Sequence, residues 1–146
     1  MKIRKLEEPE IPAAMELVWR VFQEFEAPAY PPEGIETFRR FITDRSESRR
    51  LLVYGAFEEG TLTGVLALRS GGTHVSLFFV EAARHRQGIG KALFRYAPRD
   101  TGPQTLTVHA APYAVEIYRH LGFRATGQTR QEDGILYIPM RWEAGR

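Results

Sequence analysis

V-E-A-A-R-H-R-Q-G-I-G-K-A-L-F-R-Y, residues Val80 to Tyr96, is the stretch that decides the fold of this chain. The six residues before Glu81, V-S-L-F-F-V, are β-branched, aromatic or apolar, which is typical of a buried strand. After Gly88, apolar residues recur at helical spacing as far as Tyr96. The sequence therefore predicts a strand that ends, turns and enters a helix near Gly88.

The turn has the composition of an anion site. Gly88 and Gly90 remove two side chains where the helix begins, so a ligand can approach bare backbone N–H groups. The helix N-terminus contributes the positive end of its dipole, and Arg84, Arg86 and Lys91 contribute full charges. These features together indicate a site for a phosphate-like group.

Glycine pairs also mark ordinary strand-to-helix turns, so a purely structural turn is the alternative. Two well-known phosphate loops do not match. A Rossmann G-x-G-x-x-G would need glycine at Leu93, and a P-loop would need Ser or Thr where Ala92 stands.

A second stretch of sequence favours an anion-binding turn over a purely structural one. Residues 110–123 read A-A-P-Y-A-V-E-I-Y-R-H-L-G-F. With it, the chain resembles the GNAT superfamily of acyl-CoA N-acyltransferases. Residues 85–90 are similar to the family's R/Q-x-x-G-x-G/A motif, and Ala114 to Phe123 to its A-x-x-x-Y-x-x-x-G-F motif. One position departs from the pattern: His85 stands where the family usually has Arg or Gln, which leaves a side-chain role there in doubt.

The resemblance implies a single N-acetyltransferase domain over residues 1–146, with an α/β (α+β) GNAT-like fold. We expect a mixed, mostly antiparallel sheet of six to seven strands flanked by about four helices. Composition agrees, because 146 residues suit one domain. A net charge of +2 is too small to argue for nucleic acid. No apolar run is long enough for a signal peptide or a membrane helix, so we expect a cytoplasmic protein without a membrane partner.

The pattern along the chain predicts the remaining elements. Two amphipathic helices before residue 43 enclose the proline-rich loop 26–32. The predicted strands cover residues 2–6, 51–57, 62–68, 75–80 and 105–109, followed by one beginning at Phe123 and a last one over residues 135–140. We expect the helix after Gly88 to stop before Pro98, the strands at 75–80 and 105–109 to be parallel, and Pro139 to mark an edge or bulge. The last strand is a candidate for pairing across a homodimer.

The resemblance also assigns the co-substrate, acetyl-CoA, with no metal. Its diphosphate is expected on the backbone from residue 85 to 91, and its pantetheine arm in a gap between two splayed strands. The cofactor-binding residues are then Phe79, Val80, His85, Arg86, Gln87, Gly88, Ile89, Gly90, Lys91 and Ala111. Glu26 and Tyr30 are candidates to bind the amine acceptor, although Tyr30 packing over a proline is an equal alternative.

Acyl transfer to an amine needs a deprotonated amine, a stabilised oxyanion and a proton for the departing thiolate. The chain has no cysteine, so a thiol nucleophile is excluded. The family's tyrosine position is Tyr118, which we expect to protonate the sulfur. Glu81 is a candidate general base, with capping or pairing with Arg84 as an equal alternative for its carboxylate. His109 and removal of the proton by water are further alternatives. His74 shares a face with Phe78 and Val80 by alternation, and a histidine there is more often structural.

The sequence thus predicts direct transfer of acetyl from acetyl-CoA to a small-molecule or peptide amine through a ternary complex. The alternative is a non-catalytic acyl-CoA sensor or interaction module of the same fold. No residue in the first two helices or the last hairpin identifies the chemical class of the amine.

Overall fold

The computed structural model of the chain describes residues 1–69, 71–85 and 87–145. The helices are α1 (Ile11–Phe25), α2 (Pro32–Thr43), α3 (Arg45–Ser48), α4 (Ile89–Thr101) and α5 (Val115–His120). The strands are β1 (Lys2–Lys5), β2 (Leu52–Glu58), β3 (Thr61–Arg69), β4 (His74–Val80), β5 (Thr105–Ala110), β6 (Arg124–Ala125), β7 (Arg130–Glu132) and β8 (Ile135–Glu143). Single 3₁₀ turns lie at Glu8–Glu10, Ala27–Ala29, Ala82–Arg84 and Pro112–Ala114. The predicted change from strand to helix at Gly88 is confirmed, because Gly88 is the N-cap of α4.

The strands form one mixed sheet in the order β1-β2-β3-β4-β5-β8-β6, with β7 also paired to β8. Every neighbouring pair is antiparallel except β4 and β5, which are parallel as predicted. The described residues form eight strands and five α-helices, one more of each than the pattern of the sequence indicates. The additional elements are β7 and α3, which are too short to leave a hydrophobic period.

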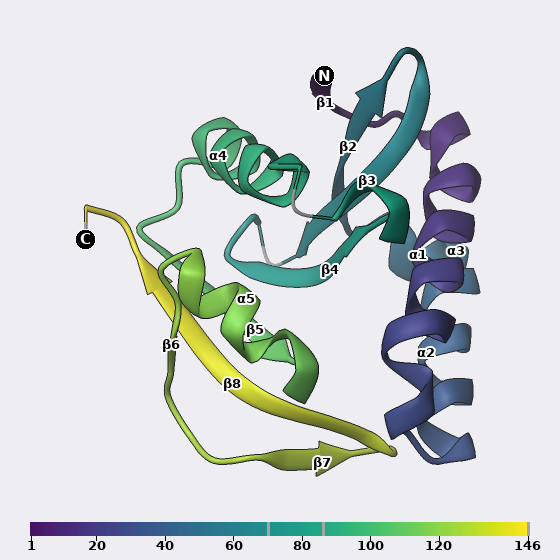
Figure 1. Cartoon of the computed structure of the whole chain (residues 1–146), viewed down its shortest axis with the longest axis vertical. Helices are drawn as coiled ribbons and strands as arrows, with labels where there is room; N and C mark the ends of the chain where they lie inside the picture. Colours follow the sequence, from purple (N-terminus) through teal and green to yellow (C-terminus); the bar gives the residue numbers. More distant parts are fainter. Residues whose placement is uncertain (70, 86, 146) are drawn as a thin grey trace.

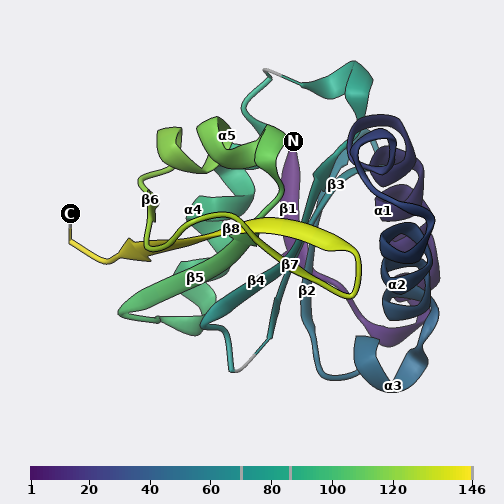
Figure 2. The same ribbon diagram turned by 90° about the horizontal axis from the view of Figure 1, so that it is seen from below.

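The helices cover the two faces of the sheet unequally (Figures 1 and 2). α1, α2 and α3 lie on one face, where Val18 and Phe22 of α1 pack with Val65 of β3 and Leu77 of β4. α4 and α5 lie on the other face, where a second core surrounds residues such as Leu93. No described helix is long and apolar enough to cross a bilayer.

A β-bulge interrupts β4 at Ser76. Leu68 of β3 pairs with Val75, but the next residue of β3, Ala67, pairs with Leu77. The extra residue moves the residues before it to the opposite face of the strand. The prediction that His74 shares a face with Phe78 and Val80 is therefore wrong. It assumed that side chains alternate regularly from Val80 back to His74, but Ser76 has no partner in β3 and breaks that alternation.

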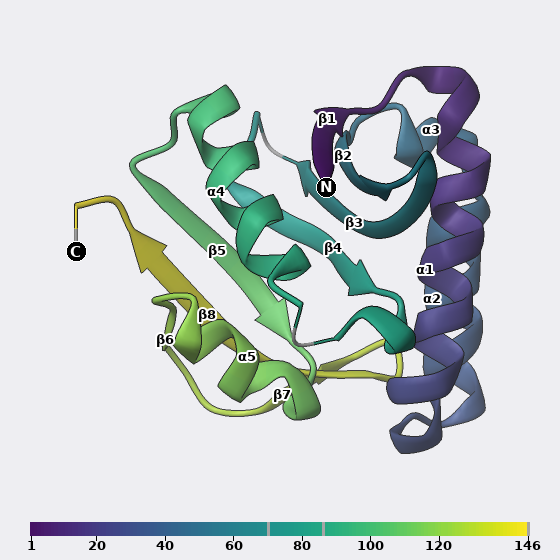
Figure 3. The same ribbon diagram turned by 45° about the horizontal axis from the view of Figure 1, so that its top comes forward.

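β4 and β5 are paired over a short length and then separate. The parallel ladder consists of His74 with Thr107 and Val75 with Val108, and it goes no further. Both strands nevertheless continue, β4 to Val80 and β5 to Ala110. The splay that the family resemblance implies is thus present, and the β5-facing backbone of β4 beyond Val75 lacks a strand partner. Figure 3 shows the two strands running in the same direction behind α4 and α5.

α4 does not stop before Pro98. The helix continues to Thr101 and is closed by Gly102, which has φ of 66° and donates its N–H to the Pro98 carbonyl at 2.6 Å. A proline inside a helix removes one N–H donor and crowds the preceding turn. Here that loss falls within the last turn, while the adjacent Ala97 is fully buried in the core. Packing therefore outweighs the local preference against a proline.

β8 is an interior strand and does not offer an edge for a dimer. It pairs with β5 on one side and with β6 and β7 on the other. Pro139 lies in the gap between the two short partners, since β6 ends opposite Met140 and β7 begins opposite Tyr137. Pro139 is therefore not at an edge, and it lies opposite the irregular segment 126–129, which agrees with the bulge alternative of the prediction. The free edges of the sheet belong to β1 and to the short strands β6 and β7.

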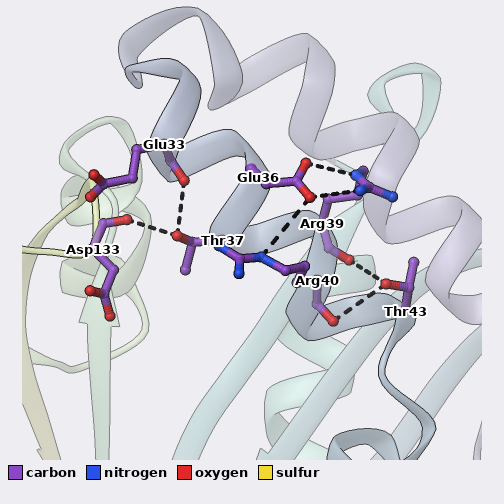
Figure 4. A network of polar contacts seen from close by, with 7 residues as sticks. All are labelled: Glu33, Glu36, Thr37, Arg39, Arg40, Thr43 and Asp133. Atoms are coloured by element: carbon purple, nitrogen blue, oxygen red, sulfur yellow. Dashed lines mark hydrogen bonds and ion pairs between the residues drawn. The ribbon is translucent and has the colours of Figure 1, made fainter.

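α2 is docked against the turn between β7 and β8 by direct backbone contact. A Cβ atom on Gly34 would overlap with the carbonyl oxygen of Gly134, and a Cβ on Gly134 would overlap with the backbone of Gly34. Beside this contact, the Thr37 hydroxyl lies 2.8 Å from the Asp133 carbonyl oxygen and 2.9 Å from that of Glu33 (Figure 4). The hairpin and the helix are therefore held together at one fixed separation.

We expect Gly34→Ala to destabilise the protein. Alanine is the better helix former, by up to about 1 kcal/mol, so a position free of contacts would gain stability. Because the added methyl group would displace a backbone carbonyl, we expect a net loss of about 1–3 kcal/mol in the free energy of unfolding. Chemical denaturation measures this difference, and a more stable variant would contradict the contact.

Candidate active site

A cavity of about 920 Å³ lies where β4 and β5 separate. Its lining comes from the loop after α1, from α2, from the end of β3, from β4 with the glycine turn, from β5, from the α5 segment and from the start of β8. Eleven of the residues predicted for the site line it, namely Glu26, Tyr30, Phe79, Val80, His85, Gly88, Ile89, Gly90, Lys91, Ala111 and Tyr118. Gln87 and Glu81 are not among the lining residues, and Arg86 lies outside the described residues.

The glycine turn presents backbone to the cavity. Gly88 adopts a left-handed conformation with φ of 80°, and a Cβ there would meet nothing within 4 Å. Gly90 is glycine for a different reason, since a Cβ would lie 2.7 Å from the ring of Phe78. The first N–H groups of α4 have no acceptor within the helix, so they remain available to a ligand. Lys91 is exposed in the same turn of helix and adds a full positive charge.

The His85 side chain is fixed by a polar contact and a ring contact. One ring nitrogen, Nε2, lies 2.7 Å from the Val80 carbonyl oxygen, and the ring centroid lies 5.0 Å from that of Phe25. Phe25 also stacks on Tyr113, at 6.0 Å and 12°. Three rings thus connect the end of α1, the glycine turn and the start of the α5 segment at one end of the cavity.

Tyr118 projects from α5 into an aromatic enclosure. Its ring lies 5.3 Å from Phe123, 5.8 Å from Phe78 and 6.1 Å from Phe94, measured between centroids. The residue is 6% exposed and lines the cavity. Its hydroxyl has no hydrogen-bond partner among the described residues, and burial, followed by the charge of Glu26, raises the pKa of the phenol. The proton therefore stays on the oxygen at neutral pH and can be donated.

Glu26 is the carboxyl group of the cavity. It follows α1, and its Oε1 lies 3.4 Å from the Tyr30 hydroxyl. Burial raises the pKa of Glu26 to about 7, although the hydrogen bond from Tyr30 opposes the shift. Tyr30 lies 3.5 Å from the Leu136 carbonyl oxygen and its ring is 5.6 Å from Phe22, so it does not rest on a proline alone. A carboxyl group titrating near pH 7 is suited to accept a proton.

The sequence profile of the acetyltransferase (GNAT) domain matches residues 26–144. The chain belongs to this family. The GNAT domain makes it an N-acetyltransferase by class.

Solved structures place the whole chain in the same fold. A GCN5-related N-acetyltransferase from Rhodopseudomonas palustris superposes with a TM-score of 0.82 at 18% identity, over 97% of this chain and 94% of that one. The PaiA N-acetyltransferase of Thermoplasma acidophilum, solved with coenzyme A, gives 0.73 at 22% over 97% and 98%. An aminoglycoside 6'-N-acetyltransferase complexed with coenzyme A gives 0.65 at 15% over 98% and 97%. No curated protein matches the chain.

In this GNAT domain Glu81 lies apart from the groups described above. Its Oε1 is 2.7 Å from the Arg20 guanidinium of α1, and it is not a lining residue. Gln87 turns back along the chain, with its amide nitrogen 3.4 Å from the Ala83 carbonyl oxygen. The structure therefore brings Glu26 and Tyr118 into one cavity and keeps Glu81 outside it.

Several lining residues were not predicted for the site, among them Arg69, Ser76 and Tyr113. Arg69 and Tyr113 carry no motif that distinguishes them from surface residues. Ser76 lies at the bulge, which has no sequence signal, and its buried Oγ has no hydrogen-bond partner among the described residues. A buried hydroxyl without a partner is uncommon in folded proteins and is one that a bound molecule can satisfy.

The raised pKa of Glu26 predicts a pH-dependent stability that Glu26→Gln should remove. The folded protein binds this proton more tightly than the unfolded chain, so stability falls as pH rises from about 4.5, the ordinary value, to about 7. We expect the variant to lose less stability than wild type over that interval and to be the more stable of the two above pH 7. Thermal denaturation at several pH values measures this. Parallel curves for the two proteins would contradict a buried, titrating Glu26.

Proposed function

We propose that the protein transfers an acetyl group from acetyl-CoA directly to an amine within a ternary complex. The observation that carries this proposal is the meeting of Tyr118 and Glu26 in one cavity, at the place where β4 and β5 separate. The two groups come from opposite faces of the sheet, so a donor molecule and an acceptor can reach the same point from different sides.

The glycine turn and the separated strands fit the donor. The N–H groups at the start of α4 and Lys91 suit the diphosphate, and the open space at Gly88 leaves room for it. The pantetheine arm contains amides, which can hydrogen-bond to the unpaired backbone of β4 around Phe79 and Val80, and Ala111 lies across the gap. Two relatives of the same fold were solved with coenzyme A, which supports this placement.

The reaction then needs two proton transfers and no covalent enzyme intermediate. The amine nitrogen attacks the thioester carbon, and a backbone N–H in the separated part of β4 stabilises the oxyanion. When the C–S bond breaks, Tyr118 donates its proton to the thiolate. The amine proton passes to Glu26. The products are the acetylated amine and free CoA, so atoms and charge balance once the two side chains exchange protons with water.

We favour Glu26 over Glu81 as the proton acceptor. Glu26 lines the cavity with a pKa raised to about 7, whereas Glu81 is engaged with Arg20 outside it. A non-catalytic acyl-CoA sensor would need the cavity and the glycine turn, but not a proton donor and a proton acceptor within it. Binding of CoA without turnover of any amine would identify a sensor.

We expect Gly88→Glu to abolish acetyl-CoA binding. The substitution puts bulk and negative charge into the space proposed for the diphosphate. Gly60→Glu is a matched control, because Gly60 has nearly the same φ, 82° against 80°, is also free of neighbours within 4 Å, and is not among the cavity's lining residues. Isothermal titration with acetyl-CoA compares the two. Unchanged affinity in the Gly88 variant would contradict the placement of the diphosphate.

We expect Tyr118→Phe to lower kcat by about 100-fold, in line with the loss of a general acid. Acetyl-CoA affinity should change little, because the ring and its packing are kept. Tyr96→Phe, at an exposed tyrosine of α4 outside the cavity, is the control. Steady-state kinetics that follow the released thiol measure the effect. Full turnover in the Tyr118 variant at saturating amine would remove Tyr118 from this role.

A further inference from the structure

The cavity continues beyond the position proposed for the thioester, toward the start of β4. Arg69, His74 and His109 line it there. His74 and Val80 stand at opposite ends of β4, which separates them by about 20 Å at the usual rise per residue of a strand. Lys91 and the glycine turn lie beyond Val80. Arg69 is therefore too far from them to share the diphosphate of the donor.

Arg69 provides the positive charge at this end. Its guanidinium makes no ion pair with a described residue, and Arg69 is exposed at the end of β3. Burial, followed by the charges of Arg69 and His109, lowers the pKa of His74 to about 4. Burial and Arg69 also lower the pKa of His109. Both imidazoles are thus neutral at pH 7, and Arg69 lies close to each of them.

The other charges nearby offset one another. Arg130 and Glu132 stand two residues apart on β7 and so share a face of that strand. They act on the pKa of His109 in opposite directions, and Glu132 also accepts a hydrogen bond from the Tyr137 hydroxyl at 2.8 Å. Among the described lining residues the single carboxyl group is Glu26, which a pKa of about 7 leaves only partly ionised. The charge of Arg69 is therefore not compensated within the cavity.

The two histidines are built into the wall. His74 Nδ1 lies 2.7 Å from the Thr107 hydroxyl, and the His109 ring stacks on Tyr137 with 4.1 Å between centroids. The rings of Phe38 and Phe41 and the side chain of Ile135 complete the acceptor side with apolar surface. A molecule bound here meets apolar walls along its length and a cation at its end.

We propose that the acceptor is an amine that also carries a carboxylate, and that Arg69 binds this carboxylate while the amine lies between Glu26 and the thioester. The inference rests on the proposed function. Arginine presents a planar set of N–H donors that matches a carboxylate. A polycationic acceptor such as an aminoglycoside would instead be repelled by Arg69, so this domain should differ in preference from its aminoglycoside-modifying relative.

The test uses matched pairs of amines with acetyl-CoA and follows the released thiol. Each pair consists of an α-, β- or γ-amino acid and its carboxamide, which keeps the amine and its distance along the chain. We expect the carboxylate member of at least one pair to have a kcat/KM higher by roughly 10- to 100-fold, the range for a hydrogen bond between charged groups. Kanamycin and spermidine should be poor acceptors.

Arg69→Gln should remove this preference through KM, with kcat at saturating amine and acetyl-CoA affinity unchanged. Arg45→Gln, at an exposed arginine of α3 outside the cavity, should keep the preference of wild type. Arg69→Glu should turn the preference toward the carboxamides and spermidine.

The outcomes separate the two proposals. Turnover of carboxamides or polyamines equal to or better than the acids would overturn the carboxylate proposal and leave acetyl transfer standing. An equal preference for acids in wild type and Arg69→Gln would remove Arg69 as the binding group. Acetyl-CoA binding without turnover of any amine would contradict the proposed function, and with it this inference.

Discussion

The separation of β4 from β5 is the constraint on which the other features of this domain depend. Two neighbouring parallel strands would normally satisfy each other's backbone groups along their shared length, and buried N–H and C=O groups without partners are costly. Here the ladder ends after Val75 and Val108, next to the bulge at Ser76. Beyond that point the backbone of β4 faces a cavity and is not paired with β5. The fold thereby leaves a gap between β4 and β5 that has the width of one strand, and an extended chain with amide groups can fill this vacancy.

The vacancy also brings together parts of the chain that belong to different layers. α1 and α2 cover one face of the sheet, and α4 and α5 cover the other (Figure 2). A continuous sheet would keep Glu26 and Tyr118 apart. Because the sheet is open between β4 and β5, the charge of Glu26 contributes to the raised pKa of the Tyr118 phenol. The carboxyl group can act on the phenol because no strand lies between them.

Much of this architecture could be predicted from the sequence, because it rests on strong local patterns. The apolar run of β4, the glycine pair and the spacing around Tyr118 are properties of consecutive residues. The failures have a common physical origin in contacts between distant segments. Pro98 stays helical because the residue before it is packed in the core. The bulge at Ser76 is a matter of register between two strands, and the high pKa of Glu26 comes from surroundings supplied by several elements. None of these leaves a trace in neighbouring residues.

The outer strands have a consequence for the behaviour of the protein at high concentration. β1 is four residues long and three of them are cations, and β6 and β7 on the far side are shorter still and each contains an arginine. Unpaired strand edges are templates for self-association, and short, charged edges weaken that tendency through repulsion between like charges. The sheet is thus open between β4 and β5, where a small molecule can enter, and its short, charged edge strands oppose the growth of fibrils.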